Sequence, residues 1–361
     1  MAVDQSLAQL SNTLVYSAML VYTGALGAFA VDLAGRGAAR RPAPAAIRER
    51  VAVGATPTDP ADPVEPLQPA SVESGGSGGA AGSGGAAGSG GAAGFGGSGG
   101  AAGSAVAGAG RAASVAVSLT WLAFALHLGA VMARGFSAQR VPWGNMYEFS
   151  VSGAVVVTAV FLGVLLRRDV RYLGTFVVGP VLLTLGIAVA VLYTQASQLV
   201  PALQSFWLVI HVSVAFVASA LFTLGFSTTV LQLVQERREL ARAAGRPPVR
   251  GRFMERLPGS AELERSAYRL HVVAFPLWTF TVLAGAIWAE AAWGRYWNWD
   301  PKEVWSFVIW VVYAGYLHAR STRGWDGRRA AYFALAGYAC ILFNFLVVNI
   351  FFVGLHSYAD V

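Results

Sequence analysis

Residues 293–306 read WGRYWNWDPKEVWS and lie between two strongly apolar segments. The stretch holds four tryptophans within thirteen residues (Trp293, Trp297, Trp299 and Trp305), and two basic side chains lie among them. Flat aromatic faces can stack on a large conjugated ring, and cations can bind its acidic edge. The stretch therefore predicts a site for a porphyrin with its propionates, since an ordinary membrane loop is polar and seldom so rich in tryptophan.

Apolar segments continue on both sides of this stretch over most of the chain. Only 12% of the residues are charged and the mean hydropathy is positive, which excludes an ordinary soluble protein. A helix crosses a bilayer of roughly 30 Å with ~20 residues. Eight runs are long enough and lack the strict alternation of a β-barrel: 13–31, 114–133, 148–166, 172–193, 206–234, 267–290, 304–319 and 330–353. The predicted fold is an all-α polytopic integral membrane protein with eight transmembrane helices.

The basic residues are distributed unevenly between these runs. Of the 26 lysines and arginines, 22 lie on one side of the predicted membrane, and only Arg134, Arg140, Arg295 and Lys302 lie on the other. Because positively charged loops stay in the cytoplasm, both termini and the tryptophan-rich stretch are expected on the extracytoplasmic face of the plasma membrane. The high pI then reflects this bias, and no nucleic-acid partner is expected.

The chain divides into three expected parts. Residues 1–31 are predicted to form a retained N-terminal transmembrane helix, because no basic n-region or small-residue cleavage site is evident. Residues 32–113 are predicted to be a cytoplasmic disordered linker, Pro/Ala-rich and then Gly/Ser-rich. Residues 114–361 are expected to form a seven-helix domain with an outer tryptophan-rich loop at 291–304. Cys340 is the one cysteine, so any dithiol chemistry would belong to a partner.

The five histidines differ in their expected roles. His211 and His356 fall near the outer ends of the fifth and eighth runs, level with the tryptophans, and a six-coordinate haem needs two axial ligands. They are predicted to ligate haem iron; alternatively, each is an interfacial histidine. His318, at the cytoplasmic end of the seventh run, is either functional or a helix cap. His127 is expected to be packed or hydrogen-bonded, and His271 to be interfacial.

The tryptophans and the outer charges complete the predicted site. The four tryptophans of the stretch are too closely spaced for an interfacial belt and are predicted to face a cofactor. Arg295 and Lys302 are expected to bind propionates, and Asp300 to hold the loop or orient an axial histidine. The aromatic belts at the bilayer surfaces account for five other tryptophans: Trp121, Trp207, Trp278, Trp288 and Trp325.

Together these residues resemble a known family. The stretch 293–306 is similar to the WWD signature of haem-handling membrane proteins, and its Asp-Pro-Lys-Glu continuation resembles the System II cytochrome c maturation proteins of the CcsA or ResC family, called CcsB in actinobacterial naming. Residues 145–148 (NMYE), 199–211 (LVPALQSFWLVIH) and 354–358 (GLHSY) also resemble that family. The resemblance covers roughly 114–361, and residues 1–113 show nothing comparable.

The resemblance implies a protein of c-type cytochrome biogenesis that conveys haem b across the membrane and presents it, outside, to the Cys-x-x-Cys-His motifs of apocytochrome c. His211 and His356 would be the outer axial ligands. His318 would belong to an inner site, with the other ligand supplied by a CcsB/ResB-type membrane partner. The chain would be a subunit of a holocytochrome c synthase, or cytochrome c haem lyase, complex, and a thioredoxin-like thiol reductant would act in the same pathway.

Three other functions stay open at this point. A membrane b-type cytochrome in electron transfer would hold haem permanently, but it usually pairs intramembrane histidines on the same helices, and these five are scattered. A transporter for another substrate leaves the tryptophans unexplained and lacks matched broken helices. Haem delivery to a haem chaperone by the other maturation route uses a similar loop, but residues 301–303 and the segment containing His318 favour System II.

Overall fold

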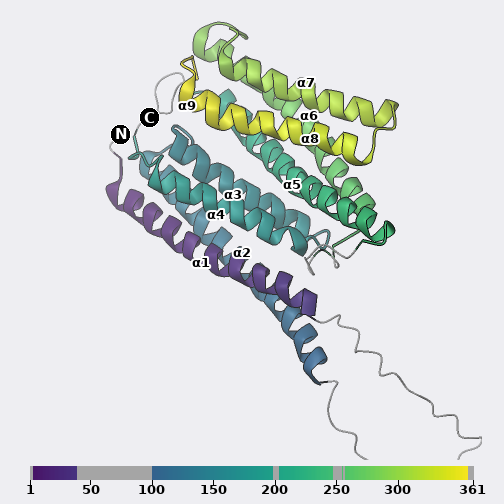
Figure 1. The fold of residues 1–361 in the computed structure, drawn as a ribbon. Coiled ribbons are helices and arrows are strands. Elements are labelled where there is room, and N and C mark those ends of the chain that lie inside the picture. The colour runs from purple at the N-terminus through teal and green to yellow at the C-terminus, as the bar shows by residue number, and fades with distance from the viewer. Residues whose placement is uncertain (1–2, 39–99, 198–202, 247–253, 255–256, 357–361) are drawn as a thin grey trace, which may run out of the picture. The chain divides into compact units, whose positions relative to one another are not determined.

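The computed structural model describes residues 3–38, 100–197, 203–246, 254 and 257–356. Those from residues 1–40 and 101–361 belong to one compact unit, and its regular elements are all helical (Figure 1). The helices are α1 (Gln5–Ala38), α2 (Gly100–Ala138), α3 (Met146–Leu165), α4 (Gly174–Ala190), α5 (Phe206–Ala243), α6 (Ser260–Trp293), α7 (Pro301–Thr322), α8 (Gly327–Leu342) and the short α9 (Asn349–Phe351). A 3-10 turn, η1 (Arg171–Leu173), precedes α4, and a π-helix, η4 (Phe343–Val348), joins α8 to α9.

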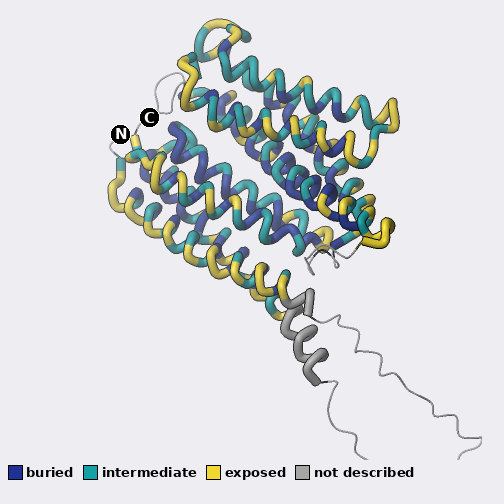
Figure 2. Tube along the Cα trace, in the orientation of Figure 1, coloured by how far each residue is buried: buried dark blue, intermediate teal, exposed yellow. Residues whose placement is uncertain are grey.

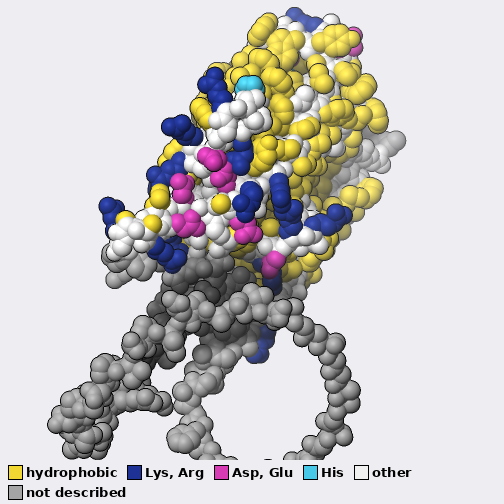
Figure 3. Space-filling model, turned by 90° about the vertical axis from the view of Figure 1, so that its right-hand side faces the viewer, with side chains coloured by type: hydrophobic (Ala, Val, Ile, Leu, Met, Phe, Trp, Pro, Cys, Tyr) yellow, Lys and Arg dark blue, Asp and Glu magenta, His cyan; other side chains and the backbone are white. Residues whose placement is uncertain are grey.

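Successive helices run antiparallel, so that the unit has two distinct ends (Figure 1). At one end lie the start of α1, the loop before α3, the loop between α6 and α7, and the residues after α9; we call this the site end. At this end the Asp4 N–H donates to the Ser137 carbonyl (2.9 Å), which joins the residues before α1 to the last turn of α2. At the opposite, basic end, α5 ends, α6 begins and α7 joins α8. Lys and Arg gather on the face shown in Figure 3 together with acidic side chains, whereas hydrophobic side chains cover its upper part.

Seven helices of the described chain are long and apolar enough to cross a membrane. They are α1, α2, α3, α4 with η1, α5, α6, and α8 continued through η4 and α9. Of the eight predicted spans, only α7 is missing from this set, because it is rich in Trp and Tyr and has charged residues near both ends. A polytopic, all-helical membrane protein is thereby confirmed, and the eighth crossing stays a prediction.

Three apolar clusters hold the helices together. The first joins α1–α4 to parts of α5 and α6 around side chains such as Tyr22, Phe29 and Phe161. The second joins α5–α8 around Phe222 and Tyr313, and the third is formed around Phe216 and Trp288. Figure 2 shows the buried positions lying between the helices, while α1 exposes its outer side. Three polar side chains cross-link the first core: the Tyr22 hydroxyl donates to Thr158 Oγ1 (3.1 Å) and contacts His127 Nδ1 (3.4 Å). His127 Nε2 also bonds the Val151 carbonyl, which confirms its prediction as a hydrogen-bonded histidine.

The helices extend beyond the predicted runs. α1 continues to Ala38 and α2 already begins at Gly100, so both enter the predicted linker of 32–113. Half of residues 100–113 are alanine, the strongest helix former. Residues 39–99 lie outside the described chain. α5 continues past the predicted run of 206–234 and ends at Ala243.

Candidate functional site

The site is built around the first turn of α7. Asp300 is the N-cap of this helix: its side chain accepts from the Lys302 N–H (3.0 Å), and Glu303 Oε2 accepts in return from the Asp300 N–H (3.2 Å). Pro301 occupies the first helical position, where its missing N–H costs no hydrogen bond. This capping box starts α7 at Pro301, eight residues after Trp293, the last residue of α6, so the loop shortens from the predicted 291–304 to 294–300.

A cavity of about 370 Å³ lies at the site end. Its volume is within the usual range for cofactor and ligand pockets. The lining comes from the helices α3 to α8, the loop before α3 and the C-terminal segment. Most of its lining is apolar. The polar lining includes His211, Thr281, Lys302, Asn344, Asn349 and His356.

His211 is fixed by the backbone of α6. Its Nδ1 lies 2.8 Å from the Thr281 carbonyl oxygen, which can only accept, so Nδ1 carries the proton and Nε2 keeps its lone pair. The imidazole also stacks on Trp288, with ring centroids 6.1 Å apart. Gly285 leaves room for this position of the imidazole, because a Cβ there would lie 2.7 Å from His211 Cε1.

His356 is fixed by the N-cap of α7. Its Nδ1 lies 2.8 Å from Asp300 Oδ1, and Asp300 Oδ2 accepts from the Leu355 N–H at 2.6 Å. Gly354 permits this approach, because a Cβ there would overlap the Asp300 carboxylate. Burial would raise the pKa of the Asp300 carboxyl, but its hydrogen bonds with His356, Lys302 and Leu355 hold that pKa below its ordinary value.

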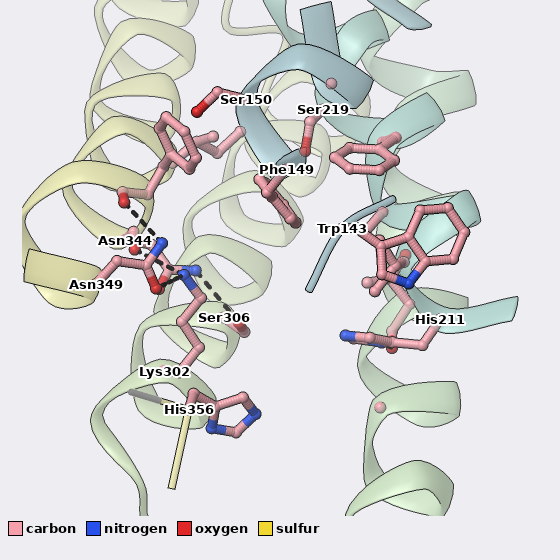
Figure 4. A pocket seen from close by; sticks show the side chains of 18 of the residues that line it. Trp143, Phe149, Ser150, His211, Ser219, Lys302, Ser306, Asn344, Asn349 and His356 are labelled. Atoms are coloured by element: carbon pink, nitrogen blue, oxygen red, sulfur yellow. Dashed lines mark hydrogen bonds between the residues drawn. The ribbon is translucent and has the colours of Figure 1, made fainter. Parts of the chain in front are cut away.

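The two imidazoles point toward each other from opposite sides of the cavity (Figure 4). Each uses Nδ1 on a protein acceptor, which is how metal-binding histidines are usually oriented, and each leaves Nε2 for a ligand. Two imidazoles can fill the axial positions of a metal whose other four ligands come from a planar ring. The predicted pair His211 and His356 therefore lines one cavity, with the Nδ1 of each ring held by a protein acceptor.

The tryptophans of the predicted site take different positions. Trp297 lines the cavity. Trp293 packs edge-on against His356, with ring centroids 4.9 Å apart. Trp305 packs on Phe343 at 4.1 Å and does not line the cavity. Trp299 is 75% exposed and has a φ of 58°, a left-handed conformation that is uncommon for a bulky residue.

The four basic residues of the site end are also used differently. Arg134 and Arg140 both bind Glu148, whose buried carboxylate accepts from Arg134 Nε at 3.0 Å and from Arg140 Nη1 at 2.7 Å. Glu148 also accepts from the Gly144 N–H, which fixes the loop that brings Trp143 to the cavity. Lys302 lines the cavity, with its ammonium on the carbonyl of Asn344 and the side chain of Asn349. Arg295 is exposed and lies off the cavity lining.

His318 lies far from this cluster. It is an exposed residue of the last turns of α7, at the basic end, and its carbonyl accepts from Thr322 Oγ1. No described contact of its ring distinguishes an inner ligand from a cap, so its role stays a prediction.

Two sequence interpretations are wrong. His271 was expected at the interface, but it is fully buried in α6 among Phe222, Tyr313 and Tyr316. Trp278 and Trp288 were assigned to the interfacial belts, but both are buried, and Trp288 touches His211 and His356. The spacing of four and then three residues from Thr281 to Gly285 to Trp288, which puts them on one face of α6, was the signal that could have revealed this wall of the site.

Comparison with known proteins places this geometry in a family. The model of the cytochrome c assembly protein family matches residues 143–356, which begin and end at residues that line the cavity. The chain is 33% identical over 253 residues to the cytochrome c biogenesis protein CcsA of Heterosigma akashiwo, covering 62% of this chain and 79% of that protein. It is 35% identical over 267 residues to CcsA of Synechococcus elongatus, covering 63% and 81%.

A solved structure shares the fold. The cytochrome c haem lyase CcmF superposes with a TM-score of 0.50 at 17% sequence identity, over 65% of this chain and 41% of that one. At this identity the likeness concerns the helical architecture alone.

Proposed function

Because this chain belongs to the cytochrome c assembly protein family, as a CcsA/ResC-type protein of c-type cytochrome biogenesis, we propose that its cavity receives haem b and presents it to apocytochrome c. The observation that carries the proposal is the pair of imidazoles, His211 and His356, each with Nδ1 on a protein acceptor and Nε2 left for iron. Bis-imidazole ligation keeps the iron six-coordinate and thereby limits its reaction with oxygen.

The cavity walls supply the rest of the proposed site. Trp288, Trp293 and Trp297 surround the histidines with aromatic faces and edges suited to a conjugated macrocycle. Asp300 orients His356 and raises its basicity as a ligand. Trp299, Trp305 and Arg295 belong to the same tryptophan-rich stretch but do not line the cavity. We propose that Arg295 and Lys302 contact the haem propionates.

The chemistry of attachment needs little from the protein beyond placement. Each apocytochrome thiol adds across one haem vinyl group: sulfur bonds to the carbon next to the ring, and the thiol proton ends on the terminal carbon. No net electron is transferred. This chain's residues hold the vinyl edge where the Cys-x-x-Cys-His motif can reach it, and the client's own histidine then replaces one of the two axial imidazoles.

The proposal extends to the membrane and to partners. We propose eight crossings of the plasma membrane, with both termini and the cavity on the extracytoplasmic face, because the basic end carries most of the positive charge. Haem would enter near His318, whose iron-binding counterpart would come from a CcsB/ResB-type subunit. A thioredoxin-like reductant would keep the client's thiols reduced, and the complex as a whole would act as the holocytochrome c synthase.

A reduced-minus-oxidised absorption spectrum with a pyridine haemochrome assay tests this function. Wild-type protein purified in detergent should show low-spin b-type haem, and the His211→Ala/His356→Ala variant should lose the haem or turn it high-spin. His318→Ala, at the other end of the unit, should load less haem but keep it low-spin. An unchanged spectrum in the double variant would move the ligands elsewhere and favour the electron-carrier alternative, and normal cytochrome c yield in that variant would refute the assignment.

A further inference from the structure

Lys302 makes contacts that propionate binding does not explain. Its Nζ donates to the backbone carbonyl of Asn344 (3.0 Å) and to the side-chain oxygen of Asn349 (2.6 Å). Figure 4 shows the lysine reaching away from the two histidines toward these asparagines. The ammonium of this cavity-lining residue is thus already engaged with η4 and the first residue of α9.

Asn344 is the second residue of the π-helix η4 (Phe343–Val348), and Asn349 follows it directly. A π-turn widens the backbone hydrogen bonds to i→i+5 and is favourable only where neighbouring groups stabilise it. α7 supplies several such contacts: Lys302 binds Asn344 and Asn349, Ser306 lies 3.4 Å from the Asn344 amide, and Trp305 packs on Phe343. Asn349 in turn donates to the Phe345 carbonyl at 2.8 Å.

This π-helix sets the direction in which the chain leaves α8. One extra residue in a helical turn rotates everything that follows by roughly 100°. His356 follows η4 by only eight residues, and its partner Asp300 precedes Lys302 by two. The first turn of α7 therefore holds the C-terminal segment at two points, through Asp300 at the histidine and through Lys302 at the π-helix.

We infer that Lys302 is a positioning residue: by binding Asn344 and Asn349 it stabilises η4 and so places His356 opposite His211. The inference rests on the proposed function for the meaning of that placement. It refines the propionate role proposed for Lys302, because two of the three ammonium N–H groups are used on Asn344 and Asn349 and only one is left for a carboxylate.

Hydrogen–deuterium exchange of the full-length, haem-free protein tests the placement without reference to haem. In Lys302→Met, the amides of residues 345–356 should exchange at least about tenfold faster, since hydrogen bonds from a charged donor are lost. Arg295→Met removes the same charge from the neighbouring loop and should leave this exchange unchanged. Asn349→Leu should reproduce the Lys302→Met result with the lysine intact, whereas Asn349→Asp keeps an acceptor and should retain protection. Unchanged exchange in both Lys302→Met and Asn349→Leu overturns the inference.

The haem spectrum then separates positioning from propionate binding. A positioning role predicts partly high-spin haem in Lys302→Met that returns to low-spin on addition of imidazole, and no further change when His356→Ala is added. Haem that is scarcer but fully low-spin, with additive loss in the double variant, would assign Lys302 to the propionates instead. If the His211→Ala/His356→Ala spectrum is unchanged, the proposed function fails, while the exchange result still decides whether Lys302 holds η4.

Discussion

Gly285→Ala is expected to disable the haem site while leaving the protein folded. The new Cβ would lie 2.7 Å from His211 Cε1 and 2.8 Å from Nδ1, whereas ordinary contacts begin at 3.4 Å. The ring must therefore move by about 0.7 Å, and its 2.8 Å bond to the Thr281 carbonyl breaks. A lost hydrogen bond costs about 1 kcal/mol, and losing the partner that orients a metal ligand costs about 10–100-fold in affinity. Alanine also favours the helix by about 1 kcal/mol over glycine, so α6 itself should not be weakened.

Haem titration followed by absorption measures this effect. Gly285→Ala should accumulate at wild-type levels, bind haem at least about tenfold more weakly and show a high-spin fraction. Gly186→Ala in α4 is the matched control, because a Cβ there meets nothing within 4 Å. If Gly285→Ala binds haem with wild-type affinity and remains low-spin, then His211 is not an axial ligand in the position described, and the reasoning from its seat on α6 is refuted.

Three further predictions follow from the same contacts. Asp300→Asn keeps an N-cap for α7 but should weaken haem binding about 10–100-fold and raise the haem reduction potential. The fold lowers the pKa of Asp300, so the contribution of its carboxylate is present above the ordinary pKa and is lost only as pH falls through the lower folded value. The wild-type spectrum should therefore be constant from pH 8 to about 5. Trp288→Leu should lower haem affinity, whereas Trp121→Leu, exposed on α2, should not; equal effects would contradict a special role for Trp288. Residues 1–40 and 101–361, expressed as separate chains, should co-purify. Three hydrogen bonds join them: Tyr22 to Thr158, Ser11 to the Ala130 carbonyl, and Asn12 to Tyr193. Recovery of 101–361 alone would contradict this prediction.

The helices and their order could be predicted from sequence because each apolar run must satisfy its own backbone hydrogen bonds in a membrane. The ends of the helices were less predictable. α6 continues through Trp293 and stops where Gly294 adopts a φ of 73°, and α7 starts at the capping box of Asp300. Both signals were present in the sequence, yet the predicted loop of 291–304 was set by the spacing of tryptophans rather than by caps.

The candidate ligands were predictable for a different reason. His211 and His356 are polar residues near the ends of apolar runs, close to the water outside the membrane. Such residues are conspicuous even in a single sequence. His271 lies equally close to the end of an apolar run, yet the structure buries it between three aromatic rings. Sequence distance from a span end gives depth in the membrane but leaves the direction of the side chain undetermined, and direction distinguishes a ligand from a core residue.

The walls of the site depend on pairs of residues that no linear pattern relates. The sequence assigns Trp288 to an interfacial belt, but in the structure α5 brings His211 against the same face of α6. The sequence assigns Lys302 to the propionates, but η4 and α9 place Asn344 and Asn349 at its ammonium. In both cases the two residues in contact are separated by 42 or more positions in the chain. A cation near a predicted haem therefore cannot be assigned to the propionates from its charge alone, because a backbone carbonyl and a side-chain amide of a neighbouring segment compete for the same ammonium.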